Sequence, residues 1–344
     1  MKWIKRIGML FIALVVISTG WIATRPSMDE LGIPYAAPAP TNSQGVTVKW
    51  YGISTLLIDD GETQLLSDGF FSRPSLLDMA LKRPIEPDTQ VIEQMLVSEK
   101  MERLAAVFPV HSHYDHAMDS ADIALRSGAQ LLGSSSSAMI ARSSGLPDNQ
   151  IQIVETGRPY TLGKFQITFF PSQHAPLPSN QGIDGTVNET FELPAPYTAW
   201  QLGEAYAILI EHPQASFIIQ GSAGFIPNTL KGVEVDAVFL GTGGLQTLSH
   251  EYVQSYVYET VTLTNPSTVY TVHHDNLFGE LGNVEQSPIL PTFDKTSAFE
   301  LSQLVLPARL EQLRFAQAIE IKNTAKKKPP NNSQATQSNS RHAD

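Results

Sequence analysis

The chain of 344 residues contains no cysteine, so disulfides, thiolate zinc ligands and an acylated cysteine of the lipoprotein type are excluded. Basic residues are also scarce: 23 Lys and Arg stand against 34 Asp and Glu, for a formal net charge of −11. Because such a chain repels anionic polymers, we expect a small-molecule substrate and no nucleic-acid partner. The sequence shows no solenoid-type repeat and no flavin-binding pattern, which argues against a solenoid fold and a redox role.

One long apolar run stands at the N-terminus. Three basic residues within the first six precede the stretch 7–23, which only Gly, Ser and Thr interrupt. The pattern predicts a signal peptide or membrane anchor over residues 1–25, the alternative being a buried first helix. The segment 35–38 is a candidate cleavage site. By the positive-inside rule the rest of the chain is expected to be exported, either periplasmic or anchored with its domain outside the cytoplasm.

Composition divides the remainder into three parts. Residues 26–45 are rich in Pro, Ala, Ser and Asn and are predicted to be a linker. Residues 46–322 mix strand and helix patterns, which predicts an α/β domain of two mixed sheets packed face to face with helices outside. Residues 323–344 are predicted to be a disordered tail. We expect strands over 46–52, 54–59, 64–68, 104–110, 130–133, 164–170, 206–211, 216–220, 237–241 and 268–273, and helices over 89–104, 120–127, 136–143 and 250–263.

Four metal-competent side chains lie within the six residues His111-Ser112-His113-Tyr114-Asp115-His116, between an expected strand and an expected helix. On extended backbone alternate side chains share a face, so His111, His113 and Asp115 can converge, while the turn into the helix carries His116 to a neighbouring position. One segment can therefore supply two adjacent metal ions. Imidazole nitrogen and carboxylate oxygen suit Zn²⁺, and a catalytic zinc keeps one coordination position open for water.

This cluster resembles the HxHYDH motif of the metallo-β-lactamase superfamily, and the resemblance extends over most of residues 46–290. It implies an αββα sandwich that binds one or two metal ions, zinc being expected and Mn²⁺ or Fe²⁺ being alternatives. His174 closes a strand as the third motif of that family does, and it would complete a first site with His111 and His113. Asp68, in Leu-Leu-Ser-Asp-Gly-Phe-Phe, matches the family aspartate that holds a metal ligand or water by hydrogen bonding.

The resemblance also implies a late histidine for a second site, with Asp115 and His116. His273 and His274 both follow a strand pattern, and alternation along the strand puts them on opposite faces, so only one can easily be a ligand. The resemblance favours His273. The chain departs from the family at Ser222, where most members carry an aspartate that bridges both metals. Because a hydroxyl compensates less charge than a carboxylate, we expect a mononuclear site or a weak second site.

These residues predict an exported metal-dependent hydrolase that uses metal-bound hydroxide on an ester, lactone, amide or phosphodiester bond of a small or lipid-derived substrate. Asp115 would bind metal and steer the proton of the water. The alternative is a catalytically impaired relative that binds a ligand or partner without turnover, which Ser222 would permit. Arg73 lies on a loop near Asp68 and is expected to be solvated, the alternative being an anion-binding role.

Overall fold

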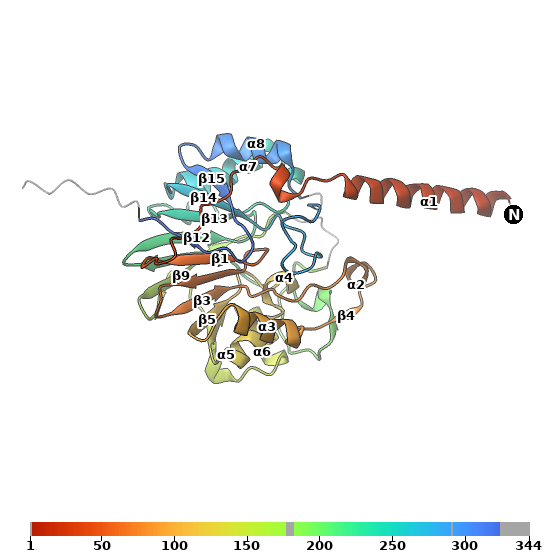
Figure 1. Ribbon diagram of the computed structural model, residues 1–344. Coiled ribbons are helices and arrows are strands. Elements are labelled where there is room, and N and C mark those ends of the chain that lie inside the picture. Colours follow the sequence, from red (N-terminus) through yellow and green to blue (C-terminus); the bar gives the residue numbers. More distant parts are fainter. Residues whose placement is uncertain (1, 177–181, 290–291, 324–344) are drawn as a thin grey trace, which may run out of the picture.

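The computed structural model describes residues 2–176, 182–289 and 292–323, and its main body consists of two seven-stranded mixed sheets (Figure 1). The order in the first sheet is β16 (Ile319–Glu320), β1 (Thr47–Trp50), β2 (Leu56–Asp59), β3 (Gln64–Ser67), β5 (Leu104–Phe108), β6 (Gln130–Gly133) and β7 (Ile151–Ile153). The order in the second is β15 (Arg309–Gln312), β14 (Thr268–Val272), β13 (Ala237–Gly241), β12 (Ala215–Gln220), β11 (Ala205–His212), β9 (Phe165–Ser172) and β8 (Pro159–Leu162). A short ladder pairs β4 (Pro84–Ile85) with β10 (Ala195–Pro196).

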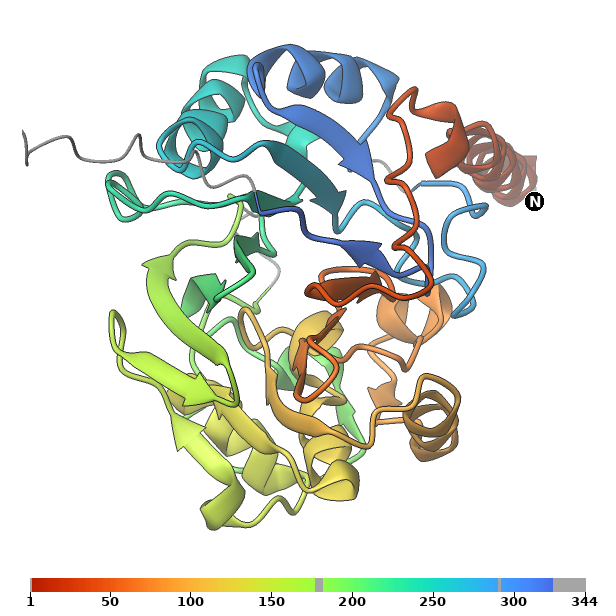
Figure 2. The ribbon, with the colours of Figure 1, turned by 60° about the vertical axis from the view of Figure 1, so that its left-hand side comes forward.

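Helices cover the outer face of each sheet, which gives the four layers expected from the sequence (Figures 1 and 2). The first sheet is covered by α3 (Thr89–Ser98), α5 (Ser120–Ser127) and α6 (Ser135–Ser143). The second is covered by α7 (His250–Val257), the π-helix η5 (Tyr258–Thr262) and α8 (Lys295–Leu304). The remaining helices are α1 (Lys2–Ala23), α2 (Leu76–Ala80), α4 (Tyr114–Ala117) and the 3₁₀ turns η1 (Met28–Glu30), η2 (Asp148–Gln150), η3 (Tyr197–Ala199) and η4 (Leu245–Thr247).

The apolar composition of the strands follows from this layering. Every residue of β13 and of β14 is buried, because one face of each strand meets the other sheet and the opposite face meets helices. Between the sheets, Phe108 of the first packs edge to face on Phe169 of the second, with ring centroids 6.2 Å apart. The sandwich therefore has its main core between the sheets, and this core fixes the strand ends that carry the site.

The N-terminal helix α1 projects away from the body (Figure 1). It is long and apolar enough to cross a membrane, and none of it is buried, so the alternative of a buried first helix is wrong. Residues 26–45, predicted to be a linker, instead lie on the sandwich and add to its core: Met28, Leu31, Ile33 and Ala36 are buried. The backbone of residue 36 donates a hydrogen bond to Gln312 O, 2.9 Å away. We call residues 25–37 the strap. The predicted disordered tail lies outside the described residues, apart from residue 323.

Candidate metal centre

The predicted site residues follow strands that end at one edge of the sandwich. Asp68 follows β3, the cluster 111–116 follows β5, His174 follows β9, Ser222 follows β12 and His273 follows β14. Each sheet brings the carboxyl ends of its parallel strands to the same edge, which is where ligands bind in α/β proteins. Segments more than 150 residues apart in the chain therefore meet at this edge.

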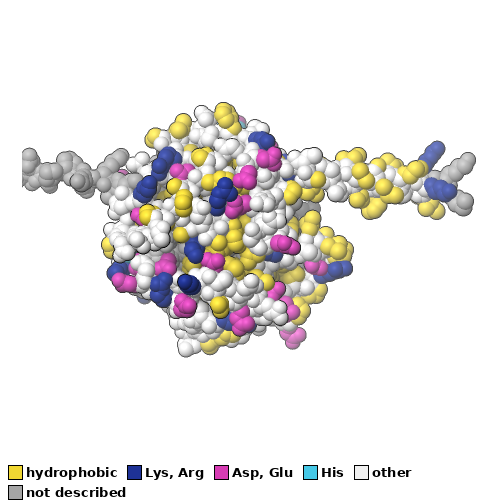
Figure 3. All heavy atoms as spheres, viewed as in Figure 1, with side chains coloured by type: hydrophobic (Ala, Val, Ile, Leu, Met, Phe, Trp, Pro, Cys, Tyr) yellow, Lys and Arg dark blue, Asp and Glu magenta, His cyan; other side chains and the backbone are white. Residues whose placement is uncertain are grey.

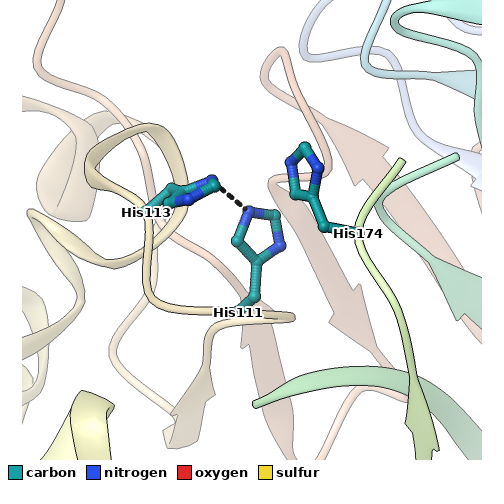
Figure 4. A group of neighbouring side chains, drawn as sticks. All are labelled: His111, His113 and His174. Carbon is teal, nitrogen blue, oxygen red and sulfur yellow. Dashed lines mark hydrogen bonds between the residues drawn. The ribbon is translucent and has the colours of Figure 1, made fainter. Parts of the chain in front are cut away.

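The first group consists of His111, His113 and His174, whose rings converge as Figure 4 shows. Their candidate ligand atoms lie within 4.8 Å of one another. His111 Nε2 is 3.0 Å from His113 Nδ1, and the ring centroids of His111 and His174 are 4.9 Å apart. The structure thus brings together three imidazoles from two distant segments.

The second group consists of Asp115, His116 and His273, and its candidate ligand atoms also lie within 4.8 Å of one another. Nε2 of His116 is 3.1 Å from Nε2 of His273. Asp115 Oδ2 is 3.7 Å from His116 Nε2 and 3.5 Å from His273 Nε2. The two groups adjoin, because the ring centroids of His111 and His116 are 4.0 Å apart.

His274 does not join either group. Its side chain is fully buried, packs against the ring of Phe293 at 5.4 Å, and has no hydrogen-bond partner on either ring nitrogen among the described residues. Burial lowers the pKa of His274 to about 4, so its imidazole is neutral in the core. Of the two adjacent histidines, only His273 faces the cluster.

Hydrogen bonds on the outer side of the rings direct the inner nitrogens of three histidines toward the cluster. His113 Nε2 donates to Ile183 O at 3.2 Å, and His174 Nδ1 donates to Ala175 O at 2.8 Å. His116 Nδ1 donates to Asp68 Oδ2 at 2.8 Å. Since a neutral imidazole has one N–H and one lone pair, each of these bonds leaves the lone pair on the inner nitrogen, which is the arrangement of metal-binding histidines.

The buried carboxylate of Asp68 forms hydrogen bonds with three segments of the site. Its Oδ2 accepts from Ser54 Oγ at 2.5 Å as well as from His116, and its Oδ1 accepts from the backbone N–H of Val110 at 2.9 Å. The residue has a positive φ of 55°, which costs free energy in a residue other than glycine and persists only where the surroundings hold it. Asp68 therefore fixes both the ring of His116 and the start of the loop that carries the cluster.

Ser222 lies beside the first group without facing its nitrogens. Its Oγ accepts the backbone N–H of Ala175 at 3.1 Å, directly after His174. Its carbonyl oxygen accepts from the side-chain amide of Gln220 at 3.0 Å. The hydroxyl thus holds the His174 loop against the end of β12 by a neutral hydrogen bond and supplies no charge.

A buried charge pair supports the loop that carries His273, a contact that the sequence does not predict. His273 has a positive φ of 61°, and its backbone N–H donates to Ile53 O at 2.9 Å. Two residues later, Asp275 Oδ1 accepts the N–H of Ile53 at 2.8 Å. Arg73 Nη1 lies 3.5 Å from Asp275 Oδ2, and the side chains of this pair are 6% and 0% exposed. The prediction of a solvated Arg73 is therefore wrong. The guanidinium of Arg73 neutralises Asp275, whose carboxylate accepts the hydrogen bond from Ile53.

Electrostatics keep the imidazoles of the first group neutral. Burial lowers the pKa of His174 to about 3, and burial also lowers the pKa of His111 and of His113 below the usual value. In the second group, burial alone would raise the pKa of Asp115, but the nearby His116 and the hydrogen bond with His273 hold it below its usual range. Neutral imidazole and ionised carboxylate are the forms that bind metal ions.

The donor set fits a divalent metal ion in each group. In a tetrahedral zinc site with bonds of about 2.0–2.1 Å, ligand nitrogens are about 3.4 Å apart. The separations of 3.0 Å in the first group and 3.1 Å in the second are close to this value. His111 Nδ1 has no hydrogen-bond partner among the described residues, so either nitrogen of this neutral ring can carry its proton, and Nε2 can present its lone pair to a metal ion.

The topology of two mixed sheets between helices, with an HxHxDH cluster at their shared edge, decides the fold. The chain has the metallo-β-lactamase fold. No family model matches the chain. A UPF0173 metal-dependent hydrolase from Pyrobaculum arsenaticum is 25% identical over 128 residues, which is 37% of this chain and 50% of that protein. The chain thus spans about half the length of the curated relative that it matches.

Several solved structures resemble the chain at low sequence identity. Igni18, a metallo hydrolase from Ignicoccus hospitalis, is 15% identical, with 80% of this chain and 97% of that one covered at a TM-score of 0.49. An isothiocyanate hydrolase from Delia radicum gut bacteria is 14% identical, with 80% and 99% covered at a TM-score of 0.49. CmlA, a diiron β-hydroxylase from Streptomyces venezuelae, is 14% identical, with 81% and 55% covered at a TM-score of 0.49.

An open cavity of about 580 Å³ lies beside His174. Its wall includes Gln173, Asp184, Glu204 and Tyr206, and the described residues that line it include no Lys or Arg. The two carboxylates give this space a negative potential, which disfavours an anionic ligand.

No pattern in the sequence singles out several residues that build the site. Ser54, Ile53 and Asp275 act through backbone and second-layer hydrogen bonds, and Ile183 contributes only its carbonyl oxygen. Backbone groups are the same at every position, so no pattern of side chains could have singled out Ile183. Asp275 is the exception: an acidic residue directly after two histidines was a visible candidate.

Proposed function

We propose that the protein is a metal-dependent hydrolase, held at the membrane by α1, that cleaves an ester, lactone or amide bond in a neutral small or lipid-derived substrate. The observation that supports this most is the convergence of two three-residue donor groups at one strand edge, each within 4.8 Å. Donor groups on buried, hydrogen-bonded rings are preorganised for metal ions, and structural roles seldom require such convergence.

In this proposal His111, His113 and His174 hold one metal ion, and Asp115, His116 and His273 hold a second. A bound divalent ion supplies Lewis acidity, which polarises a carbonyl group and makes water a stronger acid. Zinc is the proposed metal, and manganese and iron accept the same nitrogen and oxygen donors. The relative from Pyrobaculum arsenaticum is named as a metal-dependent hydrolase, which agrees with this assignment.

The protein side chains have distinct tasks. Asp115 remains ionised at neutral pH, so besides binding it can accept a hydrogen bond from water and direct its lone pair toward the substrate. Asp68 keeps the ring of His116 oriented through the 2.8 Å hydrogen bond to Nδ1. His113 and His174 are oriented in the same way by carbonyl oxygens.

The charges near the groups favour a neutral acyl substrate over a phosphodiester. The described wall of the cavity beside His174 carries Asp184 and Glu204 and no basic side chain. Arg73, the basic residue expected near Asp68, is buried against Asp275 and is not available to bind a substrate anion. A carboxylic ester, lactone or amide would enter such a space without charge repulsion.

The strap supports a retained anchor over a cleaved signal peptide. Cleavage at residues 35–38 would remove buried Met28, Leu31 and Ile33 together with the pairing of residue 35 with Gln312. Each lost buried side chain would expose apolar surface of the sandwich. A helix of 22 residues is about 33 Å long, which is enough to span the hydrocarbon core of a bilayer.

The test is an assay of the purified full chain, with measured zinc, manganese and iron content, on nitrophenyl esters, lactones, an anilide and bis-nitrophenyl phosphate. We expect acyl hydrolysis that falls by more than about 100-fold in His113→Ala. The matched control is His250→Ala, at the start of α7, where the side chain is exposed and contacts Glu300. Equal activity in the wild type and His113→Ala would contradict the proposal, and preferred hydrolysis of the phosphate would contradict the neutral substrate.

The alternative function, ligand binding without turnover, is favoured by Ser222, because its hydroxyl is bonded to the N–H of residue 175 and adds no charge between the two groups. Ser222→Asp tests the charge argument. We expect this variant to retain more metal after dialysis than the wild type, and Ser222→Asn, similar in size but neutral, to retain no more. If the wild type retains two equivalents of metal after dialysis, the second site is not weak. Full metal loading without hydrolysis of any substrate would favour the alternative function.

A further inference from the structure

We propose that α2 is a second membrane-contact element, which holds the metal-site edge against a phospholipid bilayer so that an amphiphilic substrate reaches it from the lipid. The proposal rests on the anchorage by α1 proposed above. It adds a bilayer-docking surface on the body, a direction of substrate entry and a substrate class, namely an ester or amide that carries an acyl chain.

The surface of α2 has the composition of an interfacial element. Leu76, Leu77 and Leu81 are 49%, 57% and 56% exposed, and the five-residue helix has no buried residue. No other six-residue stretch of the described body outside α1 exposes as many large apolar side chains. Lys82 and Arg83 follow directly and are exposed, and Arg83 forms an ion pair with Asp78 of α2 at 3.3 Å. Leucines beside cations suit the boundary between acyl chains and anionic headgroups.

The position of α1 identifies the side of the body that faces the membrane. Arg25, two residues after α1, donates to the side chain of Gln246 at 2.7 Å and to Phe293 O at 3.0 Å. The chain therefore leaves α1 and binds the body at once, without a free linker. Whatever surface surrounds this attachment must lie close to the bilayer.

Helix α2 lies on the same side of the body as α1 in both ribbon views (Figures 1 and 2). In Figure 3, yellow apolar side chains gather at this side below α1, with dark blue basic side chains at their margin. A membrane crossed by α1 would thus meet the leucines of α2, and the two contacts together would set the orientation of the body.

The metal-site edge is connected to this surface by apolar side chains. α2 begins eight residues after Asp68. Met79 of α2 packs on a hydrophobic cluster that also contacts Tyr114 and Tyr197, and Tyr114 directly precedes Asp115. The rings of Tyr114 and Phe70 meet edge to face at 5.9 Å. Apolar and aromatic packing therefore connects α2 to the residue that precedes Asp115 of the second donor group.

The absence of cysteine permits a direct test of contact with the full chain reconstituted in vesicles of phosphatidylcholine and phosphatidylglycerol. Leu77→Cys is labelled with an environment-sensitive fluorophore, and the vesicles contain lipid with a quencher near the headgroup. The matched control is Val97→Cys, an exposed apolar position on α3. Val97 lies near Lys100, whose carbonyl oxygen accepts from Gln64 at the start of β3, opposite the end that leads to Asp68.

We expect at least a twofold greater quenching at position 77 than at position 97. Equal quenching at the two positions would overturn the proposal, whether or not the protein proves to be a hydrolase. This measurement requires no turnover, so it separates failure of the docking surface from failure of the proposed activity.

A second measurement tests substrate entry. The variant Leu77→Ser/Leu81→Ser should hydrolyse a long-chain ester embedded in the vesicles at least about 10-fold more slowly than the wild type, while its rate on a short soluble nitrophenyl ester stays unchanged. Val97→Ser should leave both rates unchanged. An unchanged rate on the embedded ester would overturn entry from the bilayer. An equal loss on both esters would also overturn it, because the substitutions would then be acting on the site itself.

Discussion

At the scale of single residues, Asp68 controls the second donor group through one carboxylate oxygen. Asp68→Asn would place an amide N–H opposite the N–H of His116 Nδ1, or leave that N–H without an ionised acceptor. We expect the affinity of the second group for zinc to fall about 10–100-fold, as the loss of hydrogen-bond partners to ligands commonly does. Competition with a chromophoric chelator measures this. Asp122→Asn on α5 is the control, and unchanged affinity in Asp68→Asn would refute the role.

The buried carboxylate of Asp119 should make the free energy of unfolding depend on pH. Its Oδ2 accepts the backbone N–H groups of Phe71 and Ser72, and its Oδ1 has no partner among the described residues. Burial raises the pKa of Asp119 to about 6 from an ordinary 3.8. The folded chain therefore binds this proton more tightly than the unfolded chain does. The stability that the proton confers is full below about pH 4 and is lost as the pH rises through about 6.

Asp119→Asn keeps an acceptor for both N–H groups and removes the titration. Between pH 4 and pH 6, the free energy of unfolding of the wild type should fall by about 2 kcal/mol relative to the variant. Urea unfolding of the full chain in detergent at several pH values measures this difference. The exposed Asp148→Asn should follow the wild type, and identical pH profiles for Asp119→Asn and wild type would refute the prediction.

The residues of the site were predictable to the extent that alternation along a strand and the resemblance of the motif apply. His111, His113, Asp115, His116 and His174 lie in two adjoining groups, but residues 111–113 form a bend and Asp115 lies on α4, so alternation along a strand does not explain their convergence. Alternation shows that His273 and His274 point to opposite faces, but it does not say which face carries the site. That choice depends on the positive φ of His273. Hydrogen bonds to Ile53, which lies over 200 residues away in the chain, impose this conformation.

At the scale of elements, the loop after β14 depends on the buried pair of Arg73 and Asp275. Arg73→Met and Asp275→Asn each leave a buried charge unpaired, so each should cost about 3–5 kcal/mol of unfolding free energy. The double variant should cost less than the sum, with a coupling energy of about 1–3 kcal/mol. Each single variant should also lower zinc affinity at the second group more than at the first.

A double-mutant cycle by urea unfolding measures that coupling. The control cycle uses Arg103 and Asp59, whose side chains are 39% and 22% exposed and whose coupling should stay below about 1 kcal/mol. If the changes in unfolding free energy at Arg73 and Asp275 are strictly additive, the two side chains do not stabilise the loop after β14 as a pair.

Elements with a clear hydrophobic pattern were predictable, and elements without one were not. The expected helix at 120–127 and the strands at 130–133 and 237–241 have the observed bounds. The expected helix at 89–104 ends at residue 98, and residues 104–108 form β5. The helices α2 and α8 and the strands β15 and β16 were not expected. β15 has the sequence Arg-Leu-Glu-Gln, whose strand conformation comes from pairing with β14 and not from local pattern.

At the scale of the whole molecule, the strap contributes to the stability of the sandwich. Met28 is fully buried, and its carbonyl oxygen accepts from the side chain of Gln312 at 3.1 Å. Met28→Ala should lower the free energy of unfolding by about 2–5 kcal/mol, measured by urea unfolding in detergent. Met9→Ala, exposed on α1, is the control. A loss below about 0.5 kcal/mol at Met28 would show that the strap is only loosely attached.

Composition predicted the apolar helix and the four layers of the body, but it predicted a linker where the strap packs. Pro, Ala, Ser and Asn are common in linkers, and they also suit an extended segment that pairs by its backbone. The buried residues of the strap are spaced too irregularly to signal a strand or a helix. The buried residues of the strap are apolar because they pack against segments that come much later in the chain.

The strap also joins two parts of the chain that are far apart in sequence. Its backbone and side chains form hydrogen bonds with Glu285, Ile289, Gln312 and Gln317, about 260–285 residues further along the chain. These contacts cannot form until residues up to about 317 have left the ribosome, and ordering so large a loop is entropically slow. If α1 enters the membrane as proposed, it would do so before the surface that receives the strap exists, and the sandwich would then complete its folding already tethered to lipid.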